Sequence, residues 1–419
     1  MFSTVKPSAF EHSQLVKGIL PFQWFYGFCG IALPPILLRP KTNSKLQTIY
    51  TGLAWCLFGI YVTFLNLLII WMVWDNNIIV DIVVQRYVLD GVTKILSIAQ
   101  NYDVICVQLT MVLSIVYGRK RLIRIYATVA QLERDISAYE THLEDKCDYF
   151  GKCCSSFGRR LLFQCGLFLL IHSILMGYTK YPMIWDNLSY QDKFLTLITF
   201  HLMYAKCSEY RVMMHVLYNL MYALELSLKK LKYEITRHEI MGNAGATTST
   251  LYRKLRTHQF LLSRFWYLVQ LLENYFSLPM LIIFLYNGIN ITHIINWIYV
   301  KSFRRNEKDT YHPYRVSYII LLFVNMMWTC WLSQNVIDKY NQIVSILHSM
   351  KIKSNDMALL HRLREYSLQL RHQKVLLTCW GFFDMNMKYF GLLSLTILTY
   401  VFILLQFKLQ VETEKLKRL

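Results

Sequence analysis

Five residues near the end of the chain have the types and the spacing to line a water-filled path through a membrane. Along a helix, alternating steps of three and four residues return to the same face. The stripe made in this way reads polar, polar, bulky apolar, polar, polar, and consists of Thr396, Thr399, Ile403, Gln406 and Gln410. If several copies of this helix surround an axis, the Ile403 side chains form a dry ring that blocks ions between two hydrated rings. Such a pore requires a symmetric ring of subunits, because one helix cannot enclose it.

The same stripe also fits an ordinary helix that faces lipid. Threonine can hydrogen-bond its own backbone, and glutamine is tolerated where a helix reaches the outer interface. The spacing alone leaves both interpretations open.

A group of charged side chains interrupts two otherwise apolar stretches, residues 87–118 and 194–224. These charged residues are Asp90, Lys94 and Asp103 in the first stretch and Lys206, Glu209 and Arg211 in the second. Ionised groups at bilayer depth are costly unless they face protein or a water-filled cavity, so we expect both helices to line an interior. Lys206 and Glu209 are three residues apart and can pair on one helix face. The second cluster fits such a structural role and a ligand-binding role equally well.

Other polar and aromatic side chains are expected inside the same bundle, where they could contact a small ligand. Aromatic rings stack on flat compounds, and amide or imidazole groups fix their orientation. The candidates are His172, His201, Tyr204, Lys206, Asn290, Asn325 and Trp328. Each of them also fits a satisfied interior position.

The sequence lacks the motifs of common enzymes and metal sites. It contains no Gly-rich phosphate loop, no Walker sequence and no Cys-x-x-Cys pair, and its ten cysteines are scattered. The stretch that begins at His238 starts like a zinc-peptidase motif, but Gly242 stands where the second histidine is needed. We therefore expect no enzymatic activity, no metal and no cofactor.

Composition indicates a membrane protein. Of the 419 residues, 55% are hydrophobic and only 17% are charged, which is unusual for soluble domains. The net charge is +19, and most of the basic residues that produce it lie between apolar blocks. Basic residues in such positions are typical of cytoplasmic loops beside an anionic leaflet. The lipid bilayer, and not a nucleic acid, is therefore the expected partner of this charge.

Seven stretches are long and apolar enough to cross a bilayer, which takes about 20 residues. The predicted spans are residues 48–74, 87–118, 161–179, 194–224, 274–300, 316–337 and 387–407. The fold class is therefore an all-α membrane protein with a single seven-helix domain. Amphipathic patterns predict long helices that project into the cytosol over residues 119–160, 225–273 and 338–386. Within residues 1–47, glycines and prolines interrupt an apolar segment, which we expect to be interfacial or re-entrant.

Charge sets the expected orientation, because cytoplasmic loops are enriched in lysine and arginine. With the N-terminus inside, the inner segments hold 29 of these residues and the outer segments hold 12. The N-terminus is then cytosolic and the C-terminus extracellular. The glycosylation sequon at Asn187 falls in an outer loop, as this orientation requires.

The end of the chain resembles the C-terminal signature of the insect gustatory receptors. That signature is Thr-Tyr, five hydrophobic residues and Gln-Phe, and the chain supplies Thr399, Tyr400, Gln406 and Phe407 in this register. Further upstream, the family tends to carry two shorter elements. They match Gln369, Leu370 and His372, and then Gly381, Phe383 and Asp384.

The resemblance implies a ligand-gated, non-selective cation channel in the plasma membrane of sensory neurons. In such a channel four identical or related subunits surround a pore lined by the seventh helices, and a tastant binds in the outer half of each bundle. The family's hydrophobic gate maps to Ile403 and its outer polar ring to Gln406. In sugar-sensing members, the similar motif has an acidic residue directly after Thr-Tyr. This chain has Val401 at that position. A bitter or aversive compound is therefore a better expectation than a sugar.

Two other classes of protein also fit the composition. A G-protein-coupled receptor has seven spans, but the inward N-terminus, the absence of outer-loop cysteines and the absence of an Asp-Arg-Tyr triplet oppose it. A secondary transporter predicts internal repeats or broken central helices, and the sequence shows neither.

Overall fold

The computed structural model describes residues 13–38, 45–87, 91–141, 149–185, 190–241, 246–302, 312–350 and 357–417. Within these ranges nearly all of the chain is helical. The helices are α2 (Gln14–Phe28), α3 (Pro35–Leu38), α4 (Lys45–Tyr87), α5 (Gly91–Thr141), α6 (Tyr149–Leu161), α7 (Leu167–Trp185), α8 (Tyr190–Met241), α9 (Ala246–Ser302), α10 (His312–His348), α11 (Met357–His372) and α12 (Met387–Lys417). A π-helical turn over Leu162–Gly166 joins α6 to α7.

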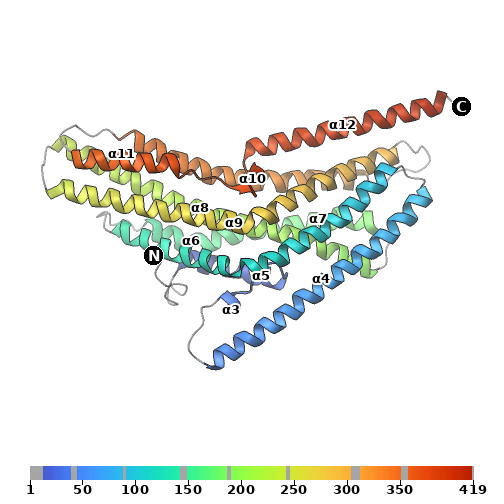
Figure 1. Cartoon of the computed structure of the whole chain (residues 1–419), viewed down its shortest axis with the longest axis horizontal. Helices are drawn as coiled ribbons and strands as arrows, with labels where there is room; N and C mark the ends of the chain where they lie inside the picture. The colour runs from blue at the N-terminus through green and yellow to red at the C-terminus, as the bar shows by residue number, and fades with distance from the viewer. Residues whose placement is uncertain are drawn as a thin grey trace.

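The long helices form an elongated bundle in which α5 packs along α9 and α10 packs along α8. Figure 1 shows α8, α9, α10 and α11 gathered at one end, while α12 diverges from the bundle toward the other end and α4 lies on the opposite side with its N-terminal end apart from the bundle. Both peripheral helices are strongly apolar, and only 11% of the most apolar part of α4 and 12% of that of α12 is buried. Their exposed side chains suit contact with lipid or with another subunit.

Among the described residues, six helices are long and apolar enough to cross a membrane. They contain the segments Ile49–Trp71, Thr93–Thr141, Ser155–Leu175, Ser249–Ile298, Pro313–His348 and Met387–Phe407. The protein is therefore a multi-pass helical membrane protein, as its composition indicates. The predicted span 194–224 is not among the six, and it lies within α8.

Helix α8 differs from the six because it is the central element of the bundle. Every side chain from Tyr204 to Met214 is buried, and α8 contacts α2, α7, α9 and α10. A helix that is buried on all sides needs no lipid-facing stripe, so it can carry charged groups that a peripheral span cannot. The number of spans and the side on which each terminus lies remain predictions.

The segment before the first span forms a helix that is inserted into the bundle. Gln23 donates to the Leu33 carbonyl at 2.6 Å and accepts from the Tyr126 hydroxyl at 2.6 Å, and the hydroxyls of Tyr26 and Ser208 lie 3.0 Å apart. The chain then reverses direction at Gly30, where φ is +68°. Gly27 permits the reversal, because a Cβ there would lie 2.9 Å from Pro34 Cα.

One part of the predicted secondary structure is wrong. The expected helical region 338–386 ends in a hairpin of two short strands, β1 (Thr378–Cys379) and β2 (Phe383–Asp384), which pair antiparallel. Trp380 and Gly381 occupy the turn with φ of +50° and +76°, a conformation that glycine adopts without strain.

The hairpin directs the chain from α11 into α12. Thr378 hydrogen-bonds Glu273 of α9, and Phe383 stacks on Tyr389 with ring centroids 3.6 Å apart. Asn386 then caps α12 by accepting from the Tyr389 amide at 2.8 Å. The signature residues Gly381, Phe383 and Asp384 thus belong to a structural element that positions α12.

Glu133 of α5 attaches α2 to the bundle. Its carboxylate accepts from the backbone amides of Gln14 and Leu15 at 2.9 and 3.2 Å and from the Ser13 hydroxyl. The N-terminus of a helix carries partial positive charge and unpaired N–H groups, so a buried carboxylate there is stabilising.

We expect Glu133→Gln to lower the free energy of unfolding by about 1–3 kcal/mol, because the amide keeps the shape but removes the charge that these donors require. Thermal unfolding of the purified protein measures this loss. The control is Glu365→Gln, which changes a carboxylate that is 45% exposed. An equal effect of the two substitutions would contradict the assignment.

Candidate functional site

The predicted pore stripe lies on the face of α12 that points away from the rest of the chain. Ile397 and Val401 are 5% and 9% exposed and pack toward the bundle, whereas Ile403 is 42% exposed. At about 100° per residue, the stripe lies nearly opposite the buried pair. All five stripe residues are exposed in the single chain.

The two threonines of the stripe bond their own helix. Thr396 donates to the Leu392 carbonyl and Thr399 to the Leu395 carbonyl, each at 2.9 Å. This arrangement satisfies the hydroxyl hydrogen and leaves the oxygen lone pairs on the exposed face. It is compatible both with a hydrated pore wall and with a helix that faces lipid.

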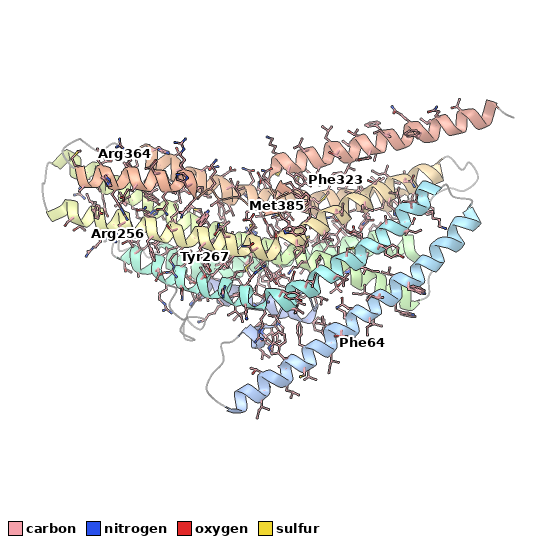
Figure 2. The ribbon with its side chains drawn as sticks, in the orientation of Figure 1. Phe64, Arg256, Tyr267, Phe323, Arg364 and Met385 are labelled. Atoms are coloured by element: carbon pink, nitrogen blue, oxygen red, sulfur yellow. The ribbon has the colours of Figure 1, made fainter. Side chains whose placement is uncertain are left out.

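Helix α12 is attached to the bundle mainly through its first turns. Phe390 lies against Phe323 of α10 with ring centroids 6.4 Å apart, and Tyr389 lies against Phe284 of α9 at 6.1 Å. Phe323 and Met385 mark this attachment in Figure 2. The stripe begins at Thr396, beyond these aromatic contacts, and α12 diverges from the bundle toward its C-terminal end (Figure 1).

A small cavity lies between α7, α8 and α10. Its volume is about 10 Å³, and it is lined by Cys165, Phe168, Leu169, His172, Tyr204, Ser208, Arg211 and Trp328. Three of the predicted ligand residues, His172, Tyr204 and Trp328, therefore come together. The rings of His172 and Tyr204 are 4.0 Å apart, although these residues are distant in sequence.

Arg211 is the only charged residue in the cavity wall, and it is 3% exposed. Its guanidinium lies 4.9 Å from the ring centroids of both Phe168 and Trp328. It donates to the Asn325 side chain and, through Nε, to the Cys207 carbonyl at 3.2 Å. Asn325, another predicted ligand residue, is thus held behind the cavity by Arg211.

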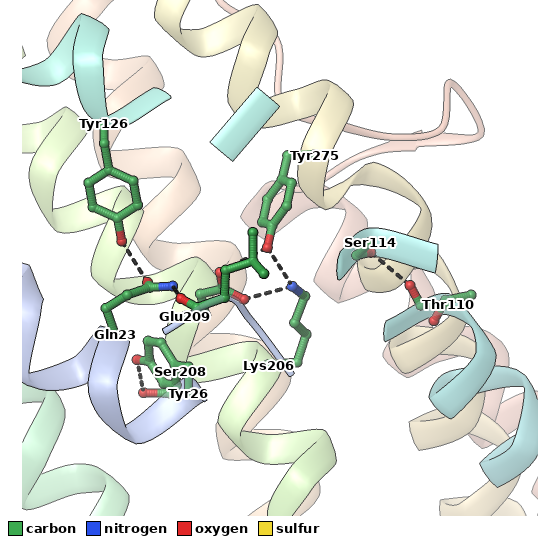
Figure 3. Close-up of polar contacts among 10 residues, drawn as sticks. Gln23, Tyr26, Thr110, Ser114, Tyr126, Lys206, Ser208, Glu209 and Tyr275 are labelled. Carbon is green, nitrogen blue, oxygen red and sulfur yellow. Dashed lines mark hydrogen bonds and ion pairs between the residues drawn. The ribbon is translucent and has the colours of Figure 1, made fainter. Parts of the chain in front are cut away.

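Lys206 lies on the other face of α8, away from the cavity. Its ammonium is 2.6 Å from the Glu209 carboxylate, and both side chains are fully buried. The Tyr275 hydroxyl of α9 accepts from Lys206 at 3.3 Å and donates to Glu209 at 3.1 Å, as Figure 3 shows. The ion pair expected from the spacing is present, and this geometry favours the structural role of Lys206.

Comparison with known proteins agrees with the motif and with the fold. Residues 16–411 match the family described as 7tm Chemosensory receptor. The chain is 32% identical over 379 residues to "Putative gustatory receptor 98b" of Drosophila melanogaster, covering 89% of this chain and 91% of that protein. It is 27% identical over 404 residues to "Putative gustatory receptor 98c" of the same species, covering 96% and 95%.

The chain belongs to the insect gustatory receptor family. The gustatory receptor also has the fold of a solved structure, the insect olfactory receptor OR5 from Machilis hrabei. The TM-score is 0.62 at 12% identity, covering 93% of this chain and 98% of that one. A second structure of OR5, in complex with eugenol, gives a TM-score of 0.59 over 94% and 98% at 12% identity. This membership does not favour a G-protein-coupled receptor.

A polar seam between α5 and α9 of the gustatory receptor holds Asn290. Asn290 accepts from Gln100 at 2.8 Å and donates to the hydroxyls of Tyr286 and Tyr318 at 3.2 and 2.9 Å. The seam continues through Ser97 with His293 at 2.9 Å and Thr93 with Asn296 at 2.8 Å. The repeated spacing of three and four residues along both helices is the sequence signal that would have revealed the seam.

The remaining predicted residues lie in different surroundings. His201 is half-buried on α8, one turn before Tyr204, and Asp103 is buried as expected of a residue facing the interior. Lys94 is half-buried on α5. Asp90 and the sequon residue Asn187 lie outside the described residues.

We expect Lys206→Met to lower the free energy of unfolding by about 3–5 kcal/mol, because it leaves the Glu209 carboxylate buried without its cation. The double variant Lys206→Met/Glu209→Met removes both charges and should regain most of that loss. Thermal unfolding of the purified receptor measures both effects. Arg362→Met, which breaks a partly exposed pair with Glu365, is the control and should cost less than about 1 kcal/mol. The pairing would be contradicted if the loss in free energy of unfolding in the double variant equalled the sum of the losses in the two single variants.

Proposed function

We propose that this gustatory receptor is a ligand-gated, non-selective cation channel for taste compounds in the plasma membrane of sensory neurons. Four subunits, identical or related, would surround a pore lined by α12. The observation that carries this proposal is the position of the polar stripe nearly opposite the buried face of α12. In an assembly around an axis, this face would line the pore, whereas in the single chain it is exposed.

Hydration explains why the stripe suits a pore better than lipid. Gln406 and Gln410 carry amide groups with several donors and acceptors, and an amide that enters hydrocarbon without partners costs several kcal/mol. In a ring of subunits, these amides meet water while Ile403 closes the narrowest point by excluding it. Two polar rings around one apolar ring are the arrangement that such a gate requires.

The taste compound is proposed to bind inside the bundle between α7, α8, α9 and α10. The expected contacts are His172, His201, Tyr204, Asn290 and Trp328, with Asn325 behind them. Support comes from the cavity shared by three of these side chains and from the fold shared with a receptor whose structure contains eugenol. Lys206 is left out of this set because Glu209 and Tyr275 already satisfy it.

The cavity must enlarge to admit an organic compound. A volume of about 10 Å³ has room for one water molecule, so side chains such as Trp328 would have to move. Trp328 lies on α10, which also contacts the start of α12 through Phe323 and Phe390. Movement of α10 is therefore the route by which ligand entry would reach the pore helix.

A bitter or aversive compound fits this interior better than a sugar does. The proposed contacts are mostly aromatic rings. In addition, Val401 occupies the position after Thr-Tyr at which sugar-sensing members of the family are expected to carry an acidic residue. Currents recorded from cells that express the chain, alone and with related subunits, across sugars and bitter compounds will test this. We expect responses to bitter aromatic compounds and none to sugars, and a sugar-evoked current would overturn the assignment.

We expect Ile403→Ala to produce a current without ligand, because the smaller side chain widens the ring and admits water. Whole-cell recording with surface labelling measures the current for each receptor at the surface. Leu398→Ala is the control, since Leu398 is 48% exposed on a flank of α12 outside the stripe. A silent Ile403→Ala receptor that reaches the surface normally would exclude Ile403 as the gate.

A further inference from the structure

The cavity beside Arg211 combines a buried positive charge with a space for one small particle. Among the residues that the structure describes, the recorded contacts of Arg211 are to uncharged groups, which include two aromatic rings, the Asn325 side chain, and the carbonyl and side chain of Cys207. A buried ion without a counter-charge costs several kcal/mol. The nearby Glu209 is engaged by Lys206 and Tyr275 on the opposite face of α8.

Hydrogen-bond donors surround this space, and several are unused. A guanidinium has five N–H groups, and the recorded bonds of Arg211 use Nε and one Nη2 hydrogen. The Tyr204 hydroxyl and His172 Nε2 are buried and form no hydrogen bond with any residue that the structure describes. Tyr318 lies beside the Tyr204 hydroxyl and interacts with it.

The donors favour an acceptor-only particle over water. The exposed fractions of Tyr204 and His172 are 4% and 3%, so neither group can use bulk solvent. A water molecule would leave the positive charge without a partner, whereas the polar part of the wall offers the Arg211 guanidinium and the hydroxyls of Tyr204 and Ser208 as donors. A monatomic anion satisfies several donors at once, and it also supplies the counter-charge that Arg211 lacks.

We propose that this cavity binds one small monovalent anion of the size and charge of chloride. Arg211 provides the charge, and Tyr204, His172 and Ser208 provide hydrogen-bond donors from α7 and α8. Phe168 and Trp328 form the apolar side of the space, and they would move slightly to admit an ion larger than one water molecule. The site shares His172, Tyr204 and Trp328 with the pocket proposed for the taste compound, but it follows from charge, donors and volume within one subunit and does not require channel activity.

The test is the thermal stability of the purified receptor in sodium chloride and in sodium gluconate at equal ionic strength. A ligand that binds only the folded state raises the melting temperature in a saturable way, so chloride and bromide should raise it and gluconate should not. Arg211→Gln should abolish the difference. Arg264→Gln, which removes a cation that pairs with Asp135 outside the cavity, should keep it.

A milder pair of variants decides the question if Arg211→Gln does not fold. Tyr204→Phe removes one donor from the cavity and should raise the chloride concentration for half-maximal stabilisation about tenfold. Tyr210→Phe removes a buried hydroxyl of the same helix that bonds Ser333 instead, and it should leave that concentration unchanged. Equal melting temperatures in chloride and gluconate would show a water-filled cavity and overturn the proposal. An unchanged response in Tyr204→Phe would overturn it too.

Discussion

The charged groups of α8 are the constraint on which the rest of the structure depends. Lys206, Glu209 and Arg211 lie within two turns of one helix and are almost completely buried. Charges at this depth in a membrane protein are tolerated only where protein groups or water replace the lost hydration. Helix α8 must therefore be enclosed, and its two charged faces determine which helices enclose it. The Lys206–Glu209 pair requires Tyr275 of α9, and Arg211 requires Asn325 and Trp328 of α10.

This requirement separates the bundle into an interior and a periphery with different chemistry. The inserted helix α2 covers another part of α8 through Tyr26 and Ser208 and contributes no charge there. Helices α4 and α12 carry almost no buried surface in their most apolar parts, because the interior is already complete without them. They are consequently available for lipid and for neighbouring subunits. A polar stripe on α12 is compatible with that freedom, since no packing within the chain dictates its residues.

Much of this arrangement could be predicted from local sequence, and the failures share one cause. Apolar length predicted the long helices, and a spacing of three residues predicted the Lys206–Glu209 pair. The hairpin at Thr378–Asp384 was missed because amphipathic periodicity before it suggested helix, while its turn depends on the positive φ of Gly381. The cavity was only partly foreseen, because His172 and Tyr204 meet through the packing of α7 on α8. Local patterns contain no information about such long-range contacts.

The interior and the pore helix are joined through α10 in the proposed channel. Trp328 contacts Arg211 at the cavity, and Phe323, five residues earlier, contacts Phe390 at the start of α12. A ligand shifts a conformational equilibrium only by the difference between its affinities for the two states. When a compound displaces Trp328, the receptor loses the contact between this ring and Arg211. The free energy gained from the contacts of the compound in the open state must exceed this loss. The small cavity volume thus acts as a threshold, because only ligands that replace the broken aromatic contacts can stabilise the displaced position of α10.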